Sequence, residues 1–573
     1  MRNVKILRID MTTGLCATSF LSGTDLYLGG RRLTSKIVAT EVAPTCHPLG
    51  KHNKLIIACG ALAGTHISCA NRISVGAKSP LTGGIKEANG GGMVGYHMGR
   101  LDVRGIIVEG LPAVPDTKWI LHLDKDGARL LPGDDIAGLG VFRKAESLYQ
   151  RFGDGVALTL IGPVGEWKLP SAGVANTDKD GNPTRYAARG GLGAVMGSKG
   201  LLAIVYDSTG APKETFVDKE EISRQRRDLA KRISENPQTA EVWRYCGTPA
   251  MMSTTNKIGA LPTHNFRTGR FKGFDEINAL AMYDKIVLRG GVGTTTHACM
   301  VGCLLQCSNI YPSPDGKEVL CTPMEYENMG LLGSNLCIND LDAIARLNTW
   351  CNDLGVDAIE MGAALGVVME AGVLQFGDAA GAEQAMREVA KGSAFGRVLA
   401  SGAGVTGIVY GCTRVPTVKN QAMPAYDPRG LKGTGVTYAT SPQGADHTAG
   451  STARAKVIHN KKEGQVEASF NAQVGGAMFA DMLGVCMKLG AAIPDWSTML
   501  AMVKGRFGVK LELHDFKAMA RETVLQERAF NHQAGLGPGH DILPEFFYEE
   551  DNPAAGTAFD ISPDEMQKMF NGL

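Results

Sequence analysis

Three cysteines stand four residues apart in HACMVGCLLQC, residues 297–307. On a straight helix Cys299, Cys303 and Cys307 would share one face, but the first and last thiols would lie about 12 Å apart along the axis. That spread is too wide for a single metal ion or a compact cluster to bind all three sulfurs. We therefore expect the segment to bend, with Gly302 as the residue at which the turn is made.

The triplet has a structural and a chemical interpretation. The structural one is a helical stripe of packed thiols, since a free cysteine often serves as a small buried hydrophobe. The chemical one is a metal site, and zinc sites usually show paired thiols, or thiol and imidazole, at shorter spacings. Three nearby cysteines and a distant one suit a [4Fe–4S] cluster better, because such a cluster takes four thiolates. The sequence thus favours an electron-transfer cluster.

Composition and charge limit the partners of such a site. The 573 residues include 59 Lys and Arg against 58 Asp and Glu, a formal charge of +1, so nucleic acid is not an expected partner. No stretch reaches about 18 uncharged apolar residues and the first residues lack a signal-peptide pattern, so we expect neither membrane insertion nor export. A cytoplasmic protein would keep its 13 cysteines reduced.

The elements that must position the thiols change in character along the chain. Short apolar or alternating runs predict strands up to about residue 207, and helical periodicity follows from Asp218. The expected strands are KILRID, KLIIACG, RISVGA, GIIVEG, KWILHL, VALTLIG and LLAIVY, and the expected helices are DKEEISRQRRDLAKRISE, LDAIARLNTWCNDLG, AEQAMREVAKGS and FKAMARETVLQERAF. We predict an α+β fold with a β-rich cofactor-binding domain at 1–207 and two mostly α-helical domains at 216–411 and 412–573.

Two glycine-rich loops lie in the β-rich part of a chain with 73 glycines. NGGGMVG, residues 89–95, contains GxGxxG, but the preceding KSPLTGGIKEA is not expected to be a strand, which argues against a dinucleotide fold. RGGLGAVMGSKG, residues 189–200, has GSK where a phosphate loop requires GK followed by Ser or Thr. Both loops fit either tight turns or bare backbone laid against a bulky anionic ligand.

A repeated hexad forms a third pattern. NDLGVD at 352–357 and DMLGVC at 481–486 share the form Asn or Asp, any residue, Leu-Gly-Val, any residue. The structural interpretation is two ordinary helix ends, each capped by its glycine. The functional interpretation is that each hexad contacts one half of a two-fold ligand. Cys486, at the end of the second hexad, is a candidate for the fourth cluster thiolate.

Together these segments resemble the aldehyde ferredoxin oxidoreductase family, tungsten enzymes with a bis-pterin cofactor and one [4Fe–4S] cluster. The resemblance runs from end to end of the chain. It is carried, in order, by NRISVGAKSPLTGG at 71–84, NGGGMVG, RYAARGGLGAVMGSK at 185–199, the cysteine triplet, EYE at 325–327, NDLGVD, KNQAMPAYDPRG at 419–430, YATSPQGADH at 438–447 and DMLGVC.

The resemblance implies which residues would hold the cofactors. Arg72 matches an arginine between cluster and pterin, where its guanidinium could bond both. Asn89 and Gly91, and Arg185 and Tyr186 in the second loop, match residues at the pterin phosphates, with a magnesium ion linking the two halves. Asn352, Asp357 and Asp481 match the hexad residues that bind pterin amines, and the cluster ligands would be Cys299, Cys303, Cys307 and Cys486.

The resemblance also implies the catalytic residues. Glu327 would activate a water molecule, and His447 would bond the carbonyl oxygen or carry protons, since an imidazole titrates near neutral pH. Taken alone, His447 is more typical of a loop histidine and EYE of a solvated helix start. Tyr326 is a further candidate at the reacting centre, with a packed aromatic as its structural alternative.

We therefore expect a tungsten or molybdenum oxidoreductase that interconverts an aldehyde and a carboxylic acid and passes electrons to ferredoxin or an electron-transfer subunit. A homodimer is kept open. The alternative is an electron-transfer or cofactor-carrying subunit of a larger redox complex with a non-aldehyde substrate. Two departures from the family pattern mark a divergent branch: the first cysteine gap has one residue more than in familiar members, and Asn352 replaces the usual aspartate.

Overall fold

The computed structural model describes residues 4–493 and 495–570, apart from the side chains of residues 24 and 479–481. The chain forms two compact units whose segments alternate along the sequence. Unit 1 comprises Met1–Trp243, Ala298–Gln306 and Gly476–Ala534, and unit 2 comprises Arg244–His297, Cys307–Gly475 and Gly535–Leu573. The domain boundaries expected from the sequence, at 207–216 and 412–430, remain predictions.

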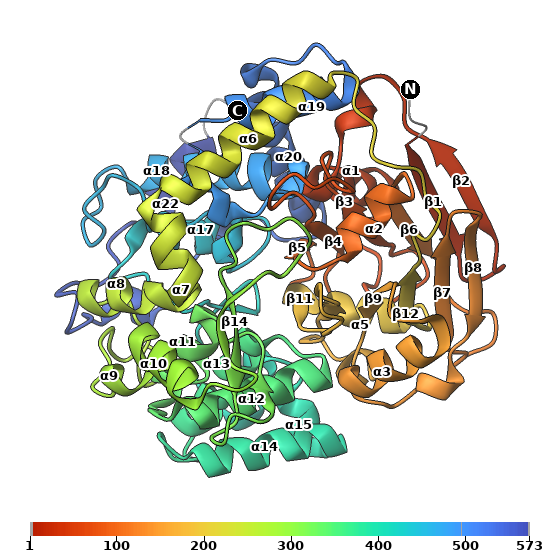
Figure 1. Ribbon diagram of the computed structural model, residues 1–573. Coiled ribbons are helices and arrows are strands. Elements are labelled where there is room, and N and C mark those ends of the chain that lie inside the picture. The colour runs from red at the N-terminus through yellow and green to blue at the C-terminus, as the bar shows by residue number, and fades with distance from the viewer. Residues whose placement is uncertain (1–3, 494, 571–573) are drawn as a thin grey trace. The chain divides into compact units, whose positions relative to one another are not determined.

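Unit 1 contains two six-stranded sheets (Figure 1). In the first, β1 and β6 run parallel and the other neighbours are antiparallel. In the second, β7 and β12 are the parallel pair. The first has the order β2 (Cys16–Phe20), β1 (Lys5–Asp10), β6 (Val103–Glu109), β3 (Leu55–Cys59), β4 (Ile73–Lys78), β5 (Ile85–Gly90), and the second β11 (Arg185–Ala187), β10 (Val174–Asn176), β9 (Ala157–Leu160), β12 (Leu201–Tyr206), β7 (Trp119–Asp124), β8 (Gly127–Pro132).

One apolar core joins the two sheets. Ile57 and Val75 from the first sheet and Leu160 and Ile204 from the second belong to the same buried cluster. All seven strands expected from the sequence are present, because each carries the apolar run that this core requires. The helices of unit 1 are α1 (Gly30–Glu41), α2 (Val94–Arg100), α3 (Val141–Phe152), α4 (Pro163–Glu166), α5 (Leu192–Ser198), α6 (Lys219–Glu235), α19 (Ser497–Phe507) and α20 (Leu513–Gln533).

Helix α20 packs against α1, so a segment near the C-terminus completes the N-terminal unit. The guanidinium of Arg31 on α1 donates to both carboxylate oxygens of Glu527 on α20, at 2.8 and 2.7 Å. Both side chains are buried, and the hydroxyl of Ser35 donates to the same carboxylate at 2.6 Å. A buried ion pair of this kind is costly to break, because removal of one partner leaves an uncompensated charge.

Strand β5 corrects an expectation from the sequence. Its segment was not expected to be a strand, yet residues 85–90 pair antiparallel with β4. Its Lys86 and Glu87 are buried, so the strand is set by its neighbour and not by an apolar pattern of its own. Because β4 and β5 run antiparallel, the loop that follows does not belong to the parallel βαβ unit of a dinucleotide fold.

Unit 2 is mostly helical, with a small antiparallel sheet of β13 (Thr294–His297), β14 (Ser308–Pro312) and β15 (Val319–Cys321). Its helices are α7 (Arg244–Cys246), α8 (Met251–Ile258), α9 (Phe274–Ile277), α10 (Ala279–Arg289), α11 (Tyr326–Leu331), α12 (Leu341–Leu354), α13 (Ala358–Glu370), α14 (Ala379–Lys391), α15 (Ala394–Leu399), α16 (Ala403–Tyr410), α17 (Lys432–Thr440), α18 (Gln465–Gly476, at the boundary with unit 1), α21 (Phe546–Glu549) and α22 (Pro563–Gln567).

The four helices expected from the sequence are found as α6, α12, α14 and α20. The β-rich N-terminal part followed by mostly helical segments confirms the expected α+β class. No helix among the described residues has the length and apolar character needed to cross a membrane.

Candidate functional site

The cysteine segment bends as the sequence predicts. Residues 298–306 form no helix, and Gly302 adopts the left-handed region at φ 71°. This bent stretch, which we call the cluster loop, belongs to unit 1 although the segments on either side belong to unit 2. The helical stripe of packed thiols is therefore excluded for Cys299 and Cys303.

Cys299 and Cys303 lie in contact in the cluster loop. The hydrogen bond that the Cys299 thiol donates to Cys303, together with burial, raises the pKa of Cys299 well above its ordinary value. The positive charges of Arg185 and Arg72 act in the opposite direction. Two guanidinium groups named by sequence reasoning therefore favour the thiolate form of Cys299, but the hydrogen bond and burial outweigh them.

The second hexad loop is bound to the segment before β4 through its backbone. The N–H of Cys486 donates to the carbonyl of Cys69 at 2.9 Å, and the N–H of Arg72 donates to the carbonyl of Gly484 at 3.0 Å. A methyl group added at Gly60 would come within 2.0 Å of the Leu483 carbonyl oxygen. The close approach of these two backbones fixes the backbone position of Cys486.

Cys69 is a thiol that the sequence analysis did not name. Its Sγ lies 3.8 Å from the Sγ of Cys303, and its side chain is fully buried. Its position three residues before Arg72, directly ahead of the segment 71–84 that carries the family resemblance, was the signal that could have identified it. Within unit 1, the thiols of Cys69 and Cys299 therefore both contact Cys303.

Cys307 lies at the base of the cluster loop and is the first residue of its segment of unit 2. It forms a parallel bridge with His297, and Gln306 before it has a left-handed φ of 48°. Its role as a cluster ligand stays a prediction. In the described ranges no three His, Cys, Asp or Glu side chains are arranged to hold a single metal ion.

Arg72 is held by the strand that precedes the first glycine loop. Its Nε donates to the side-chain oxygen of Asn89, and its Nη2 donates to the Asn89 carbonyl at 3.3 Å. A methyl group at Gly91 would lie 3.3 Å from Nη1 of Arg72 and 3.6 Å from the Cys299 sulfur. The structure thus brings these four residues named by sequence reasoning to one place beside the cluster loop.

The other glycines of this loop are explained by packing. A Cβ at Gly90 would come within 2.8 Å of the Asn176 amide, and one at Gly92 within 2.5 Å of the Thr177 carbonyl oxygen. In the second loop Arg185, on β11, forms a buried ion pair with Asp178 at 3.3 Å. Its neighbour Tyr186 is partly buried and packs on the core of the two sheets. Contact of these loops with a ligand stays a prediction.

The first hexad forms a helix junction in unit 2. Gly355 ends α12 in the left-handed conformation, as the capping interpretation expects, and Asp357 begins α13 by accepting the N–H of Ile359 at 3.0 Å. The side chain of Asn352 is almost fully buried at the end of α12. Asp481 of the second hexad lies outside the residues whose side chains the structure describes, so its role stays a prediction.

Glu327 and His447 come together in unit 2, 120 positions apart in the sequence. Oε1 of Glu327 lies 3.6 Å from Nε2 of His447, and the exposed fractions of the two side chains are 14% and 20%. Glu327 is in the first turn of α11, and its Oε2 accepts the N–H of Ala425 at 2.8 Å. His447 begins a short 3-10 turn whose N-cap is Asp446. The carboxylate and imidazole are thus partly screened and face each other.

Aromatic rings surround this pair. Tyr426 packs between Tyr326 and His447, with ring centroids 4.9 and 5.8 Å away. Tyr326 is buried, and its hydroxyl contacts the Ala425 carbonyl and the Thr255 hydroxyl, the latter at 3.1 Å. Burial raises the pKa of both tyrosines well above their ordinary value, so both hydroxyls keep their protons. Tyr426 is a residue that sequence reasoning missed, although it stands in the quoted segment 419–430.

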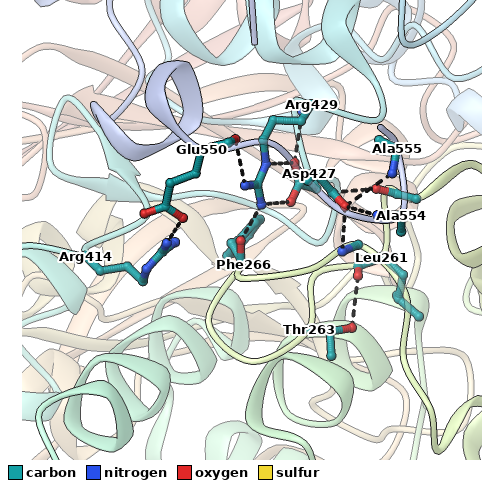
Figure 2. A network of polar contacts seen from close by, with 12 residues as sticks. Leu261, Thr263, Phe266, Arg414, Asp427, Arg429, Glu550, Ala554 and Ala555 are labelled. Atoms are coloured by element: carbon teal, nitrogen blue, oxygen red, sulfur yellow. Dashed lines mark hydrogen bonds and ion pairs between the residues drawn. The ribbon is translucent and has the colours of Figure 1, made fainter. Parts of the chain in front are cut away.

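A buried ionic network fixes the segment that carries Ala425 and Tyr426 (Figure 2). The guanidinium of Arg429 donates to both carboxylate oxygens of Asp427, at 3.0 and 2.7 Å, and both side chains are fully buried. Arg429 also donates to the carbonyls of Phe266 and Glu550. One guanidinium thus binds three separate segments of the chain. These bonds fix the segment whose Ala425 N–H donates to Glu327.

Family models match nearly the whole chain. The N-terminal domain of aldehyde ferredoxin oxidoreductase matches residues 6–208, and domains 2 and 3 of the same protein match residues 224–572. A tungsten-containing aldehyde ferredoxin oxidoreductase of Pyrococcus furiosus is 30% identical over 554 residues, which cover 92% of this chain and 88% of the relative. The Pyrococcus horikoshii counterpart is 31% identical over 96% of this chain and 92% of its own length.

More distant similarities extend to other redox proteins. An aliphatic sulfonate oxidoreductase subunit of Pyrococcus furiosus is 25% identical over 79% of this chain and 76% of its own length. The active-site complex BamBC of benzoyl coenzyme A reductase shares the fold, with a TM-score of 0.81 at 19% identity, over 100% of this chain and 94% of that one. The two relatives that are 30% and 31% identical to this chain are tungsten-containing oxidoreductases. Because both family models match in order along its length, the chain belongs to the aldehyde ferredoxin oxidoreductase family.

Proposed function

We propose that this protein is a tungsten or molybdenum bis-pterin enzyme that interconverts an aldehyde and a carboxylic acid. Its electrons would leave through a [4Fe–4S] cluster to ferredoxin or an electron-transfer subunit, in the reducing cytoplasm where thiols persist. The observation that carries the proposal is the Glu327–His447 pair, a carboxylate and an imidazole 3.6 Å apart beside two neutral tyrosines. Membership of a family with tungsten-containing oxidoreductases supports an oxidation–reduction reaction.

The residues present fit the implied cofactors. Thiolates are the ligands that an iron–sulfur cluster takes. The proposed ligands are Cys299 and Cys303 in the cluster loop, Cys307 directly after it and Cys486 in the second hexad. Arg72 lies within reach of Gly91 and Cys299, so one guanidinium could bond a cluster sulfur and an anionic pterin edge. We place Asn89, Gly91, Arg185 and Tyr186 at the pterin phosphates with their magnesium, and Asn352, Asp357 and Asp481 at the pterin amines.

When bound, the metal would act as a Lewis acid toward the carbonyl group and accept two electrons. The oxidation converts one aldehyde and one water molecule into one carboxylic acid, two protons and two electrons. Glu327 removes a proton from the water, because a carboxylate within hydrogen-bond reach is a competent general base. His447 holds or relays the second proton at Nε2, the atom that faces Glu327.

The hydrogen bond from the Ala425 N–H orients the carboxylate of Glu327. It holds Oε2, so the carboxylate presents Oε1 toward His447. Tyr426 limits the motion of the imidazole by packing against its ring. Tyr326, whose hydroxyl is bound to backbone and to Thr255, supports Tyr426 and stays a weaker candidate for contact with substrate.

The second candidate is a subunit of a larger redox complex with a non-aldehyde substrate. Two findings favour keeping it: the similarity to a sulfonate oxidoreductase subunit, and the fold shared with the BamBC complex, whose solved structure contains a dienoyl-CoA. Asn352 in place of the usual aspartate and the longer first cysteine gap also set this chain apart.

Metal analysis combined with dye reduction decides between the two. Anaerobically purified protein should contain tungsten or molybdenum together with iron, and should reduce benzyl viologen when aldehydes such as acetaldehyde or benzaldehyde are added. A protein that holds these metals but reduces no dye with any aldehyde supports the second candidate. A protein that holds iron without tungsten or molybdenum contradicts the cofactor assignment.

A further inference from the structure

Cys69 is a buried thiol that the proposed function does not use. Its Sγ lies 3.8 Å from the Sγ of Cys303, within hydrogen-bond distance for two sulfur atoms, and both side chains are buried. On the other side, the Oγ of Ser68 lies 3.4 Å from the same Cys69 sulfur. The hydroxyl and two thiols therefore form a continuous row that ends on a predicted cluster ligand.

The proton positions along this row follow from what each group can donate. A cysteine that binds iron is a thiolate, so Cys303 has no proton and can only accept. The Cys69 thiol must then be the donor in the contact between the two sulfurs. Ser68 Oγ accepts the N–H of Leu304 at 3.1 Å, which leaves its O–H to donate to Cys69. The row runs from Ser68 through Cys69 to Cys303.

We propose that Cys69, oriented by Ser68, donates a hydrogen bond to the cluster sulfur of Cys303 and thereby raises the reduction potential of the cluster. This inference rests on the cluster of the proposed function. A donor to a coordinating sulfur stabilises the extra electron of the reduced cluster, because it draws negative charge from the sulfur. Cys69 is a positioning and tuning residue in this account, and it is not a fifth ligand.

The row of Ser68, Cys69 and Cys303 lies where the cluster loop and the second hexad are both bound. The N–H of Leu304 donates to Ser68. Because Leu304 directly follows Cys303, this bond fixes the cluster loop next to the Cys303 sulfur, which accepts the hydrogen bond from Cys69. Cys69 itself has a left-handed φ of 64°, a conformation that side chains other than glycine rarely adopt, and the Cys486 N–H is bound to its carbonyl. One short segment thus contacts both the cluster loop and the second hexad.

The test is an anaerobic redox titration of the holoenzyme, with the reduced cluster followed by electron paramagnetic resonance and the iron content measured in parallel. Cys69→Ala should keep the iron and lower the midpoint potential, by an amount equivalent to about a tenfold change in the one-electron equilibrium, or about 59 mV. Cys69→Ser, which keeps a donor, should shift the potential less. Cys59→Ala is the matched control, because this buried thiol of the same unit donates to the Val103 carbonyl and should leave the potential unchanged.

Three results would overturn the inference. An unchanged midpoint in Cys69→Ala with full iron content would show that the thiol does not act on the cluster, and loss of iron would make Cys69 a ligand. If Cys69→Ala does not fold, Ser68→Ala leaves every thiol in place and should lower the midpoint in the same direction by a smaller amount; an unchanged midpoint contradicts the relay. The titration requires no aldehyde, so it remains decisive if the proposed substrate is wrong.

Discussion

Glu327 is bound at one oxygen by a backbone N–H and faces an imidazole with the other, which is a suitable arrangement for moving a proton. Neither residue would be selected by sequence pattern alone, because EYE begins an ordinary helix and His447 stands in a polar turn. Only the resemblance of the segments around them pointed to catalysis. The structure adds that the two side chains, from distant segments, lie 3.6 Å apart.

Replacement of either residue should therefore remove proton transfer and spare the cofactors. We expect Glu327→Gln and His447→Asn each to lower kcat by about 10²- to 10⁴-fold, the range that a general acid or base contributes. Tungsten and iron contents should remain those of the wild type, because neither residue is a predicted ligand of either. Steady-state dye reduction with metal analysis measures both quantities, and wild-type rates in these variants would remove the pair from the mechanism.

Cys69 shows the limit of sequence reasoning at the residue scale. The cysteine triplet was evident from its spacing, whereas a single cysteine 230 positions before Cys299 gives no periodic signal. Its contact with Cys303 depends on how the cluster loop returns to the N-terminal unit. The same reason applies to Tyr426, whose packing on His447 depends on a segment folded around the buried Arg429–Asp427 pair.

At the scale of elements, glycines define where backbones meet. Gly60 follows β3, and its Cα lies against the Leu483–Gly484 turn that leads to Cys486. The repeated hexads were evident in the sequence, and they predicted the helix end at Gly355. Gly60 belongs to no motif that would identify it. The strand β5 likewise had no apolar pattern, because its pairing with β4 determines its conformation.

Gly60→Ala tests this contact. The added methyl group would lie 2.0 Å from the Leu483 carbonyl oxygen, so the turn must move and carry Cys486 with it. We expect the purified variant to lose cluster iron while its N-terminal sheets stay folded. Gly475→Ala is the matched control, because a methyl group there meets no atom within 4 Å. Full iron content in Gly60→Ala would contradict the proposed role of Cys486 as the fourth ligand.

Helix α2 gives the N-terminal unit a pH dependence. Burial is the main reason that the pKa of His97 falls from 6.5 to about 4, and its Nδ1 lies 3.1 Å from the Ser208 hydroxyl. In the unfolded chain the imidazole binds a proton below about pH 6.5, and in the folded chain only below about pH 4. The unfolded state therefore binds more protons between these values, and stability falls as the pH falls.

The expected loss is about 3 kcal/mol at most between pH 6.5 and pH 4, from the size of the shift. Thermal unfolding of the wild type should show a midpoint that falls over this range, and His97→Gln should show a smaller fall. His52→Gln, at an exposed position, is the control and should follow the wild type. Equal slopes for wild type and His97→Gln would show that this histidine does not control the acid sensitivity.

At the scale of the whole molecule, the chain leaves unit 1 after Trp243 and returns to it twice. The first return supplies the cluster loop, and the second supplies Cys486 and helix α20. The sequence indicated the β-rich and helical regions correctly, since each has its own periodicity. It did not indicate these returns, because packing between distant segments, such as that of Arg31 with Glu527, has no local pattern.

The returns predict that the N-terminal region is incomplete alone. A fragment of residues 1–207 lacks Glu527, so Arg31 loses its partner, and it lacks Phe530, which packs in one core cluster with Leu33. We expect this fragment to unfold at a lower temperature than the same fragment joined by a flexible linker to residues 513–534. Differential scanning calorimetry compares the two, and equal midpoints would contradict the structural role of α20.

Whether an aldehyde reduces the iron–sulfur cluster through Glu327 is the most direct test of the proposed reaction. Oxidised, anaerobic holoenzyme is mixed with aldehyde, and the paramagnetic signal of the reduced cluster is followed over time. The wild-type cluster should become reduced, whereas the Glu327→Gln cluster should stay oxidised with aldehyde and become fully reduced with dithionite. Equal rates of reduction in the two proteins, or a wild-type cluster that only dithionite reduces, would contradict the account.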